Sequence, residues 1–209
     1  YTANWTPSPK AKSYTVNNFK VDPVTEDKEN YVVLRDDFEK ANSAAQEYPE
    51  GLYLDDWTDC KGWHTDMLPD GFMTSLVADG GYIGALNLPL YTPQVSLDND
   101  GGKFTVRFKV KAFGGEIIRV YSGDEMQVYD FSEVNPEGDP YAFEEHEVEM
   151  HFNNGAELQS LVIMSTVYTF MIDWFEITQN VKAGDRVIRY LDHADVTGHD
   201  SAEYRFSGL

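Results

Sequence analysis

The sequence is poor in cysteine and in basic residues, and each shortage excludes a class of protein. A single cysteine, Cys60, among 209 residues excludes an internal disulfide framework and a zinc site built from several cysteines. The 16 lysines and arginines stand against 36 aspartates and glutamates, which gives a formal net charge of −20. A chain this acidic is repelled by nucleic-acid phosphates and by anionic membrane surfaces, so we expect no nucleic-acid partner.

Long hydrophobic runs are also missing from the sequence. No apolar stretch reaches the roughly 18 residues that a membrane span needs, so we expect no membrane insertion. The chain does contain 42% hydrophobic and 14% aromatic residues. That share is enough for a packed core and too high for a disordered chain.

The dominant hydrophobic period is two, which predicts strands. In 103–113, Phe104, Val106 and Phe108 alternate with polar residues, as in a strand with one solvated face. Further strands are expected at 13–21, 30–35, 82–86, 116–121, 126–131, 144–152, 158–164, 168–178, 186–191 and 203–206. Glycine- and asparagine-rich turns separate many of them, and 37–47 is the one helix candidate. The pattern predicts an antiparallel β-sandwich or jelly roll.

Short motifs in a fixed order carry a resemblance to a known family. They are 31–39 (YVVLRDDFE), 56–58 (DWT), 62–63 (GW), Gly84, 91–93 (YTP), Leu97, 102–112 (GKFTVRFKVKA) and 172–179 (IDWFEITQ). Together they resemble the MAM-like or choice-of-anchor J jelly-roll domains of secreted and surface bacterial proteins. The two ends of the chain, 3–16 and 182–209, are similar to strands of a fibronectin type III-like domain.

The resemblance implies an all-β fold in which an antiparallel jelly-roll β-sandwich is inserted in, or flanked by, partial fibronectin type III-like strands. The expected division is a fibronectin-like segment at 1–34, the jelly roll at 35–181 and a second fibronectin-like segment at 182–209. The alternative is two flanking linkers that pair with the jelly roll. The implied function is a non-catalytic binding or spacer module of a larger bacterial protein, extracellular or on the cell surface. Its expected partners are a glycan or a cell-surface protein, beside neighbouring domains of the same chain.

Four aromatic residues are candidates for ligand binding. Trp57 and Trp63 lie in 48–80, the longest segment without clear strands, while Tyr82 and Tyr91 lie in or beside this region. Sugar rings stack on flat aromatic faces, and neighbouring polar side chains bind the hydroxyls, so the group suits carbohydrate. The alternative is that the tryptophans plug the end of the sandwich as part of its core.

The resemblance also implies a structural calcium ion between early and late strands. Asp37 and Glu39, beside Asp36, lie at the expected early position, and Asp173 matches the late aspartate of the family. Calcium takes 6–8 oxygen ligands. The alternative for Asp173, which lies in an apolar run, is a partner such as an arginine or backbone N–H groups.

An acidic strand supports the one enzymatic alternative, a glycoside hydrolase. Glu145, Glu147 and Glu149 share a strand face and superficially resemble the acidic strand of retaining β-glucanases. Retaining hydrolysis needs two carboxyl groups about 5–5.5 Å apart, which alternate strand positions can supply. However, the middle acid is a glutamate, and His146 stands where an apolar residue is usual. A solvated acidic face is the other interpretation, and we expect no enzyme.

Overall fold

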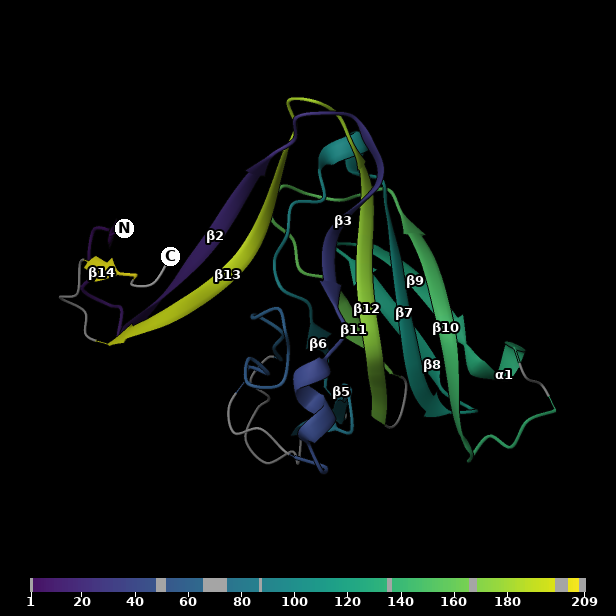
Figure 1. Cartoon of the computed structure of the whole chain (residues 1–209). Helices are drawn as coiled ribbons and strands as arrows, with labels where there is room; N and C mark the ends of the chain where they lie inside the picture. The colour runs from purple at the N-terminus through teal and green to yellow at the C-terminus, as the bar shows by residue number, and fades with distance from the viewer. Residues whose placement is uncertain are drawn as a thin grey trace.

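The protein is an antiparallel β-sandwich from which a long two-stranded arm projects (Figure 1). The computed structural model describes residues 2–47, 52–65, 75–86, 88–134, 137–165, 169–197 and 203–206. Every pairing between the strands it describes is antiparallel. The all-β sandwich expected from the sequence is thereby confirmed, while the jelly-roll connectivity stays a prediction.

One layer of the sandwich is a six-stranded sheet. Its strands are β10 (Phe143–Phe152), β7 (Phe104–Phe113), β12 (Thr169–Val181), β5 (Tyr82–Leu86), β4 (Ser75–Asp79) and β3 (Lys28–Asp36). The long strand β12 pairs with β7 along one edge. Along its other edge, the first half of β12 pairs with β5 and the second half pairs with β3. A register shift lies beside Asp173 in β12.

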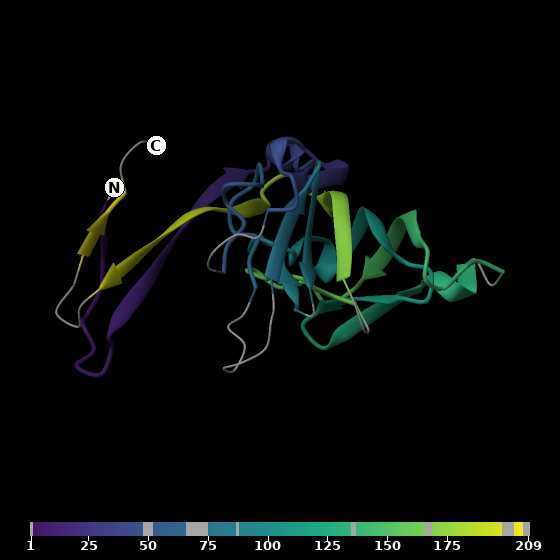
Figure 2. The ribbon, with the colours of Figure 1, turned by 90° about the horizontal axis from the view of Figure 1, so that it is seen from below.

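The second layer is a four-stranded sheet. Its strands are β6 (Leu90–Tyr91), β11 (Val162–Met164), β8 (Ile117–Ser122) and β9 (Glu125–Asp130). Seen from below, this sheet lies on the side of the sandwich away from β3 (Figure 2). One face of it packs on the first sheet, and the other face is turned outward.

The arm consists of β2 (Ser13–Pro23) paired with β13 (Arg186–Thr197) along eleven residue pairs from Ser13 to Pro23. At its tip β1 (Thr2–Asn4) pairs with β14 (Glu203–Arg205), so both ends of the described chain lie there (Figure 1). The two segments expected to resemble fibronectin strands therefore pair with each other. The expected boundary after residue 34 falls inside β3, which pairs within the six-stranded sheet of the sandwich. The division into domains stays a prediction.

The core lies between the two sheets and is rich in aromatic side chains. Alternate residues of β7 and β12 point into it and are fully or almost fully buried: Phe104, Val106, Phe108, Val110, Phe170, Ile172, Phe175 and Ile177. The four-stranded sheet contributes Leu90, Ile118, Val120 and Ile163. Apolar burial of this extent is the main source of stability in such a domain.

The predicted helix at 37–47 is wrong, because the structure has only a short 3-10 helix there, η1 (Glu39–Ser43). Phe38 adopts a left-handed backbone conformation, with φ 49°, and Ala44 returns to an extended one. Phe38 and Ala41 are both fully buried, so the segment turns once to place these two side chains in the core and then leaves. The other helical elements of the described ranges are η2 (Asn99–Gly102) and α1 (Phe131–Val134). Within the described ranges no helix has the length and apolar character needed to cross a membrane.

Candidate functional site

The two tryptophans belong to the core rather than to an exposed binding surface. Trp63 is fully buried, edge-on to Phe38 and Phe175 at centroid distances of 5.3 Å each. Trp57 is half-buried and packs against the same core. Trp63 therefore offers no open ring face for a sugar, and the alternative role, closing the end of the sandwich, fits the packing of both tryptophans.

The two tyrosines lie on different sheets. Tyr82 belongs to the six-stranded sheet, where its hydroxyl donates a short hydrogen bond to Glu145 and Lys111 lies 5.5 Å above its ring. Tyr91 belongs to β6 of the four-stranded sheet and stacks on His64 at a centroid distance of 5.0 Å. The four aromatic candidates thus do not form one cluster, and Tyr91 is the member that lies on the outward face of the smaller sheet.

The carboxylates expected to hold calcium do not converge. Arg35 binds both carboxylate oxygens of Asp37, at 3.0 and 3.2 Å, and Lys109 binds Asp173 at 2.9 Å. In the part of the chain that the structure describes, neither of these residues nor Glu39 belongs to a group of three close acidic, histidine or cysteine ligand atoms. The donor set does not fit calcium, so a calcium ion stays a prediction of the resemblance without support from these residues.

Asp36 lies next to Asp37 and is buried at the end of β3. Its carboxylate links the loop 53–64 to that strand through hydrogen bonds. Its Oδ1 accepts hydrogen bonds from the backbone N–H groups of Phe38 and Asp59, at 3.0 and 3.1 Å. Its Oδ2 accepts bonds from the backbone of Cys60, at 2.8 Å, and from Nε1 of Trp63, at 3.0 Å. Burial raises the pKa of Asp36, and the N–H donors oppose that rise. Asp36 therefore has a structural role.

The acidic strand faces a basic strand, and together they form what we call the charged face. Glu145, Glu147 and Glu149 of β10 lie opposite Lys111, Lys109 and Arg107 of β7 in the register of the sheet. Lys109 binds Glu145 at 2.7 Å as well as Asp173, and Arg107 binds Glu149 at 2.6 Å. All three glutamates are exposed. The charges of this outer surface of the six-stranded sheet are largely satisfied within the protein.

The electrostatics of the charged face do not suit acid catalysis. Hydrogen bonds from Lys109 and Tyr82 lower the pKa of Glu145, and a bond from Arg107 lowers the pKa of Glu149. A catalytic general acid needs the opposite, a raised pKa that keeps its proton near neutral pH. Burial and the nearby Asp36 raise the pKa of the Cys60 thiol to about 12, so Cys60 is not a thiolate nucleophile either.

Neutralising Glu145 is expected to remove an acid-sensitive contribution to stability. Because its folded pKa lies below the ordinary carboxyl value, this contribution is present above about pH 4.3 and is lost as the pH falls through the folded value. Glu145→Gln should lower the free energy of unfolding at pH 7 by no more than about 1 kcal/mol, since solvent screens the pair. It should also flatten the dependence of stability on pH below pH 4.3. Urea unfolding at several pH values measures both effects, with Glu147→Gln as the control. Equal behaviour of the two variants would contradict the assignment.

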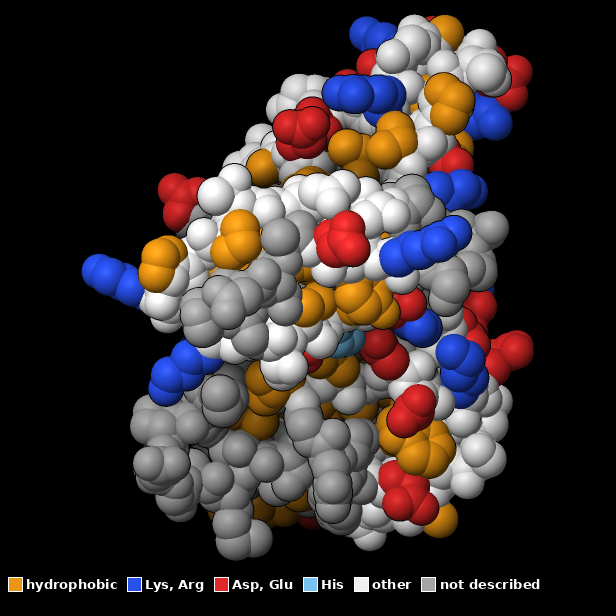
Figure 3. Space-filling view, turned by 90° about the vertical axis from the view of Figure 1, so that its left-hand side faces the viewer, with side chains coloured by type: hydrophobic (Ala, Val, Ile, Leu, Met, Phe, Trp, Pro, Cys, Tyr) orange, Lys and Arg blue, Asp and Glu red, His pale blue; other side chains and the backbone are white. Residues whose placement is uncertain are grey.

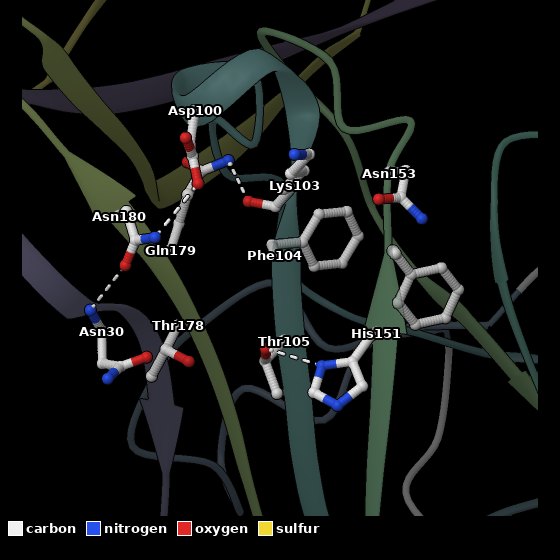
Figure 4. Close-up of a pocket in the computed structure, with 11 residues that line it drawn as sticks. Asn30, Asp100, Lys103, Phe104, Thr105, His151, Asn153, Thr178, Gln179 and Asn180 are labelled. Carbon is white, nitrogen blue, oxygen red and sulfur yellow. Dashed lines mark hydrogen bonds between the residues drawn. The ribbon is translucent and has the colours of Figure 1, made fainter.

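A polar pocket of about 240 Å³ lies where β3, β7, β10 and β12 meet η2 (Figure 4). Its side chains bind one another: Asn180 donates to Asp100 at 3.1 Å, and Thr105 bonds His151 at 3.1 Å. Gln179 donates from Nε2 to three backbone carbonyls, while its buried Oε1 has no partner among the described residues. The aromatic rings that line the pocket are buried, stacked on each other and closed to a ligand, so we assign it no ligand.

The outward surface of the four-stranded sheet, which we call the open face, is apolar. Cross-strand register places one row of side chains over all four strands: Tyr91, Val162, Tyr121 and Met126. A second row beside it holds Met164, Arg119 and Val128. Met126 is 45% and Val128 49% exposed. The other apolar members of the two rows, Tyr91, Val162, Tyr121 and Met164, are half-buried. Contiguous apolar side chains that are not fully covered mark interaction surfaces.

Sequence reasoning found Tyr91 but missed the rest of the open face. The signal was present in part, because 117–121 carries apolar residues at both alternating sets of positions. A strand that is apolar on both faces is read as buried on both faces, and only the sheet order shows which one is left uncovered.

Neither the models of protein families nor the curated proteins include a match to this chain. The evidence for its function therefore lies in its sequence and in the geometry described above.

Proposed function

We propose that the chain is a non-catalytic protein-binding module that takes its partner on the open face. The carrying observation is the continuous apolar row over all four strands of the smaller sheet, with Met126 and Val128 about half exposed. A location outside the cell or on its surface is part of this proposal and rests on the family resemblance alone.

The composition of the open face favours a protein partner. Tyrosine, methionine and arginine are enriched at the centres of protein interfaces, whereas lysine and acidic residues are depleted there. The open face has two tyrosines, two methionines and an arginine in its two rows. Neither row contains an acidic residue; Asp130 pairs with Ile117 one step beyond the second row. Because the chain as a whole has a net charge of −20, a surface with no acidic residue at its centre differs from the rest of the protein.

The partner's chemistry follows from these side chains. Arg119 lies between Met164 and Val128 in the register of the sheet, so a partner should present apolar side chains around a carboxylate. A second copy of the chain is disfavoured, because two bodies of charge −20 repel each other. A glycan is the less favoured ligand, because Val162 separates Tyr91 from Tyr121 and interrupts a stacking platform.

The electrostatics of the charged face favour a binding role over hydrolysis. The acidic residues proposed for hydrolysis are held by basic side chains that lower the pKa of Glu145 and Glu149. The hydrolase alternative therefore draws no support from their electrostatics. The projecting arm suits presentation of the sandwich at a distance from other domains (Figure 2).

A matched pair of valine variants tests the proposal. Val128 on the open face and Val32 on β3 are similarly exposed, at 49% and 40%, so Val128→Asp and Val32→Asp make the same change on opposite sheets. Wild type and both variants are used to retain proteins from a surface-protein extract. Each retained protein is then identified, purified and titrated.

We expect Val128→Asp to weaken the Kd of the purified partner at least tenfold, about 1.4 kcal/mol, and Val32→Asp to leave it unchanged. Tyr121→Ala should weaken it as well. Equal Kd values for wild type and Val128→Asp would contradict the proposal. Binding to a glycan array that depends on Tyr121, with no protein partner, would replace the protein ligand by a glycan. If wild type retains nothing beyond Val128→Asp, only a spacer role is left.

A further inference from the structure

Two segments far apart in the sequence meet at the foot of the arm. One is the loop 53–64 of the body, and the other is β13, where a register shift between Tyr190 and Asp192 interrupts the pairing with β2. Because of this shift, Tyr190 faces Phe19 and His193 faces Asn17, so both lie on one side of the arm. In Figure 3 a pale-blue histidine surface lies beneath the arm with acidic side chains beside it.

Three side chains with metal-ligand chemistry converge there. One ligand atom each of Asp55, Asp192 and His193 lies within 4.8 Å of the others, and Nδ1 of His193 is 3.9 Å from Oδ2 of Asp55. Both carboxylates are held in place through their other oxygens. The backbone of Gly62 donates to Oδ1 of Asp55 at 2.8 Å, and the backbone of His193 donates to Oδ1 of Asp192 at 2.9 Å.

A second observation concerns two buried polar atoms of this region. Nδ1 of His193 and the hydroxyl of Tyr190 are both buried, and neither has a hydrogen-bond partner among the described residues. Buried polar atoms are nearly always paired, and an unpaired one calls for a water or an ion. The ring centroids of Tyr190 and His193 are 6.4 Å apart, so both unpaired atoms belong to the same small region.

Stacking holds the plane of the His193 imidazole beside Asp55. The ring of His193 stacks on Tyr53 at a centroid distance of 4.1 Å, and Tyr53 stacks in turn on His64 at 5.2 Å. His64 continues the stack to Tyr91. A histidine held by stacking on one face loses little further freedom when it binds a metal, which favours binding.

We propose that Asp55, Asp192 and His193 bind one divalent transition-metal ion of the zinc class. Zinc takes imidazole nitrogen and carboxylate oxygen together, whereas calcium prefers oxygen ligands alone. Two ligands each about 2.1 Å from a tetrahedral ion are roughly 3.4 Å apart, so the 3.9 Å gap needs a small contraction. Lys61, which contacts Asp192 at 3.2 Å, is 45% exposed and can turn into solvent.

The site joins the arm to the body. Asp55 belongs to the body loop, and Asp192 and His193 belong to the arm, so one ion bound to all three fixes the arm's base. The proposed metal site and the proposed binding role of the open face are independent, so evidence against one does not bear on the other.

Calorimetric titration of the full chain with zinc, after treatment with chelator, tests the site. We expect one zinc per chain, a rise in Tm with zinc, and no rise with calcium at the same concentration. His193→Gln should weaken zinc binding at least tenfold. The matched control is His151→Gln. His151 is exposed and also pairs with a carboxylate, Glu149 at 3.3 Å, but belongs to no group of three ligand atoms among the residues that the structure describes. This control variant should leave zinc binding unchanged.

A second variant keeps the test decisive. If His193→Gln unfolds the chain, Asp192→Asn replaces it, with far-ultraviolet circular dichroism as the check on folding. Zinc binding that is equally tight in wild type and the folded variant would overturn the proposal. Several zinc ions per chain, or an equal loss in His151→Gln, would overturn it as well.

Discussion

Asp36→Ala is expected to lower the free energy of unfolding by about 3–5 kcal/mol. The substitution removes the acceptor of four N–H donors, three from the backbone and one from the indole of Trp63, and leaves them without a partner in the protein interior. Because these bonds hold the loop 53–64 against the end of β3, we also expect that loop to become accessible to protease. Urea unfolding followed by tryptophan fluorescence measures the change.

The adjacent residue provides the control for this prediction. Asp37 is exposed and binds Arg35 on the surface, so Asp37→Ala should cost no more than about 1 kcal/mol. If the two alanine variants differed by less than 1 kcal/mol, the anchoring role assigned to Asp36 would be wrong.

Phe175→Ala is expected to be as damaging, at about 3–5 kcal/mol, for a different reason. Phe175 is fully buried at the centre of the aromatic core, where it stacks on Phe108 at 5.7 Å and meets the edge of Trp63 at 5.3 Å. Removing its ring leaves a cavity that two rigid sheets cannot close. Chemical denaturation gives the free-energy change directly.

Val128→Ala is the contrasting substitution. Val128 is 49% exposed on the open face, so its truncation should change the free energy of unfolding by less than about 0.5 kcal/mol. A large loss of stability in this variant would mean that something in the folded protein covers the open face, and would remove the basis for its proposed role.

Most of the strands could be predicted because their signal is local. In β7 and β10 an alternating pattern fixes the inward and outward faces, and the structure reproduces it from Phe104 to Phe113 and from Phe143 to Phe152. The short strands β4 and β6 were missed because two to five residues give too little alternation to read. The helix predicted at 37–47 failed because burial of Phe38 and Ala41 overrides a weak local preference.

The roles of the site residues were harder to predict from the sequence, because they depend on partners that are distant along the chain. Nothing in the local sequence shows that the indole of Trp63 donates to Asp36, or that Lys109 neutralises Asp173. The group Asp55, Asp192 and His193 was not found either. Its members come from a body loop and from the arm, and only the pairing of the arm strands brings them together.

The most direct test of the binding role is site-specific photo-crosslinking to a protein that the wild-type chain retains from the extract. A photoreactive residue placed at Val128 should cross-link to that protein, and the same residue placed at Glu147 on the charged face should not. Both positions are exposed, so reactivity alone does not separate them. Cross-linking from position 147 but not from position 128 would contradict the assignment of the open face as the binding surface.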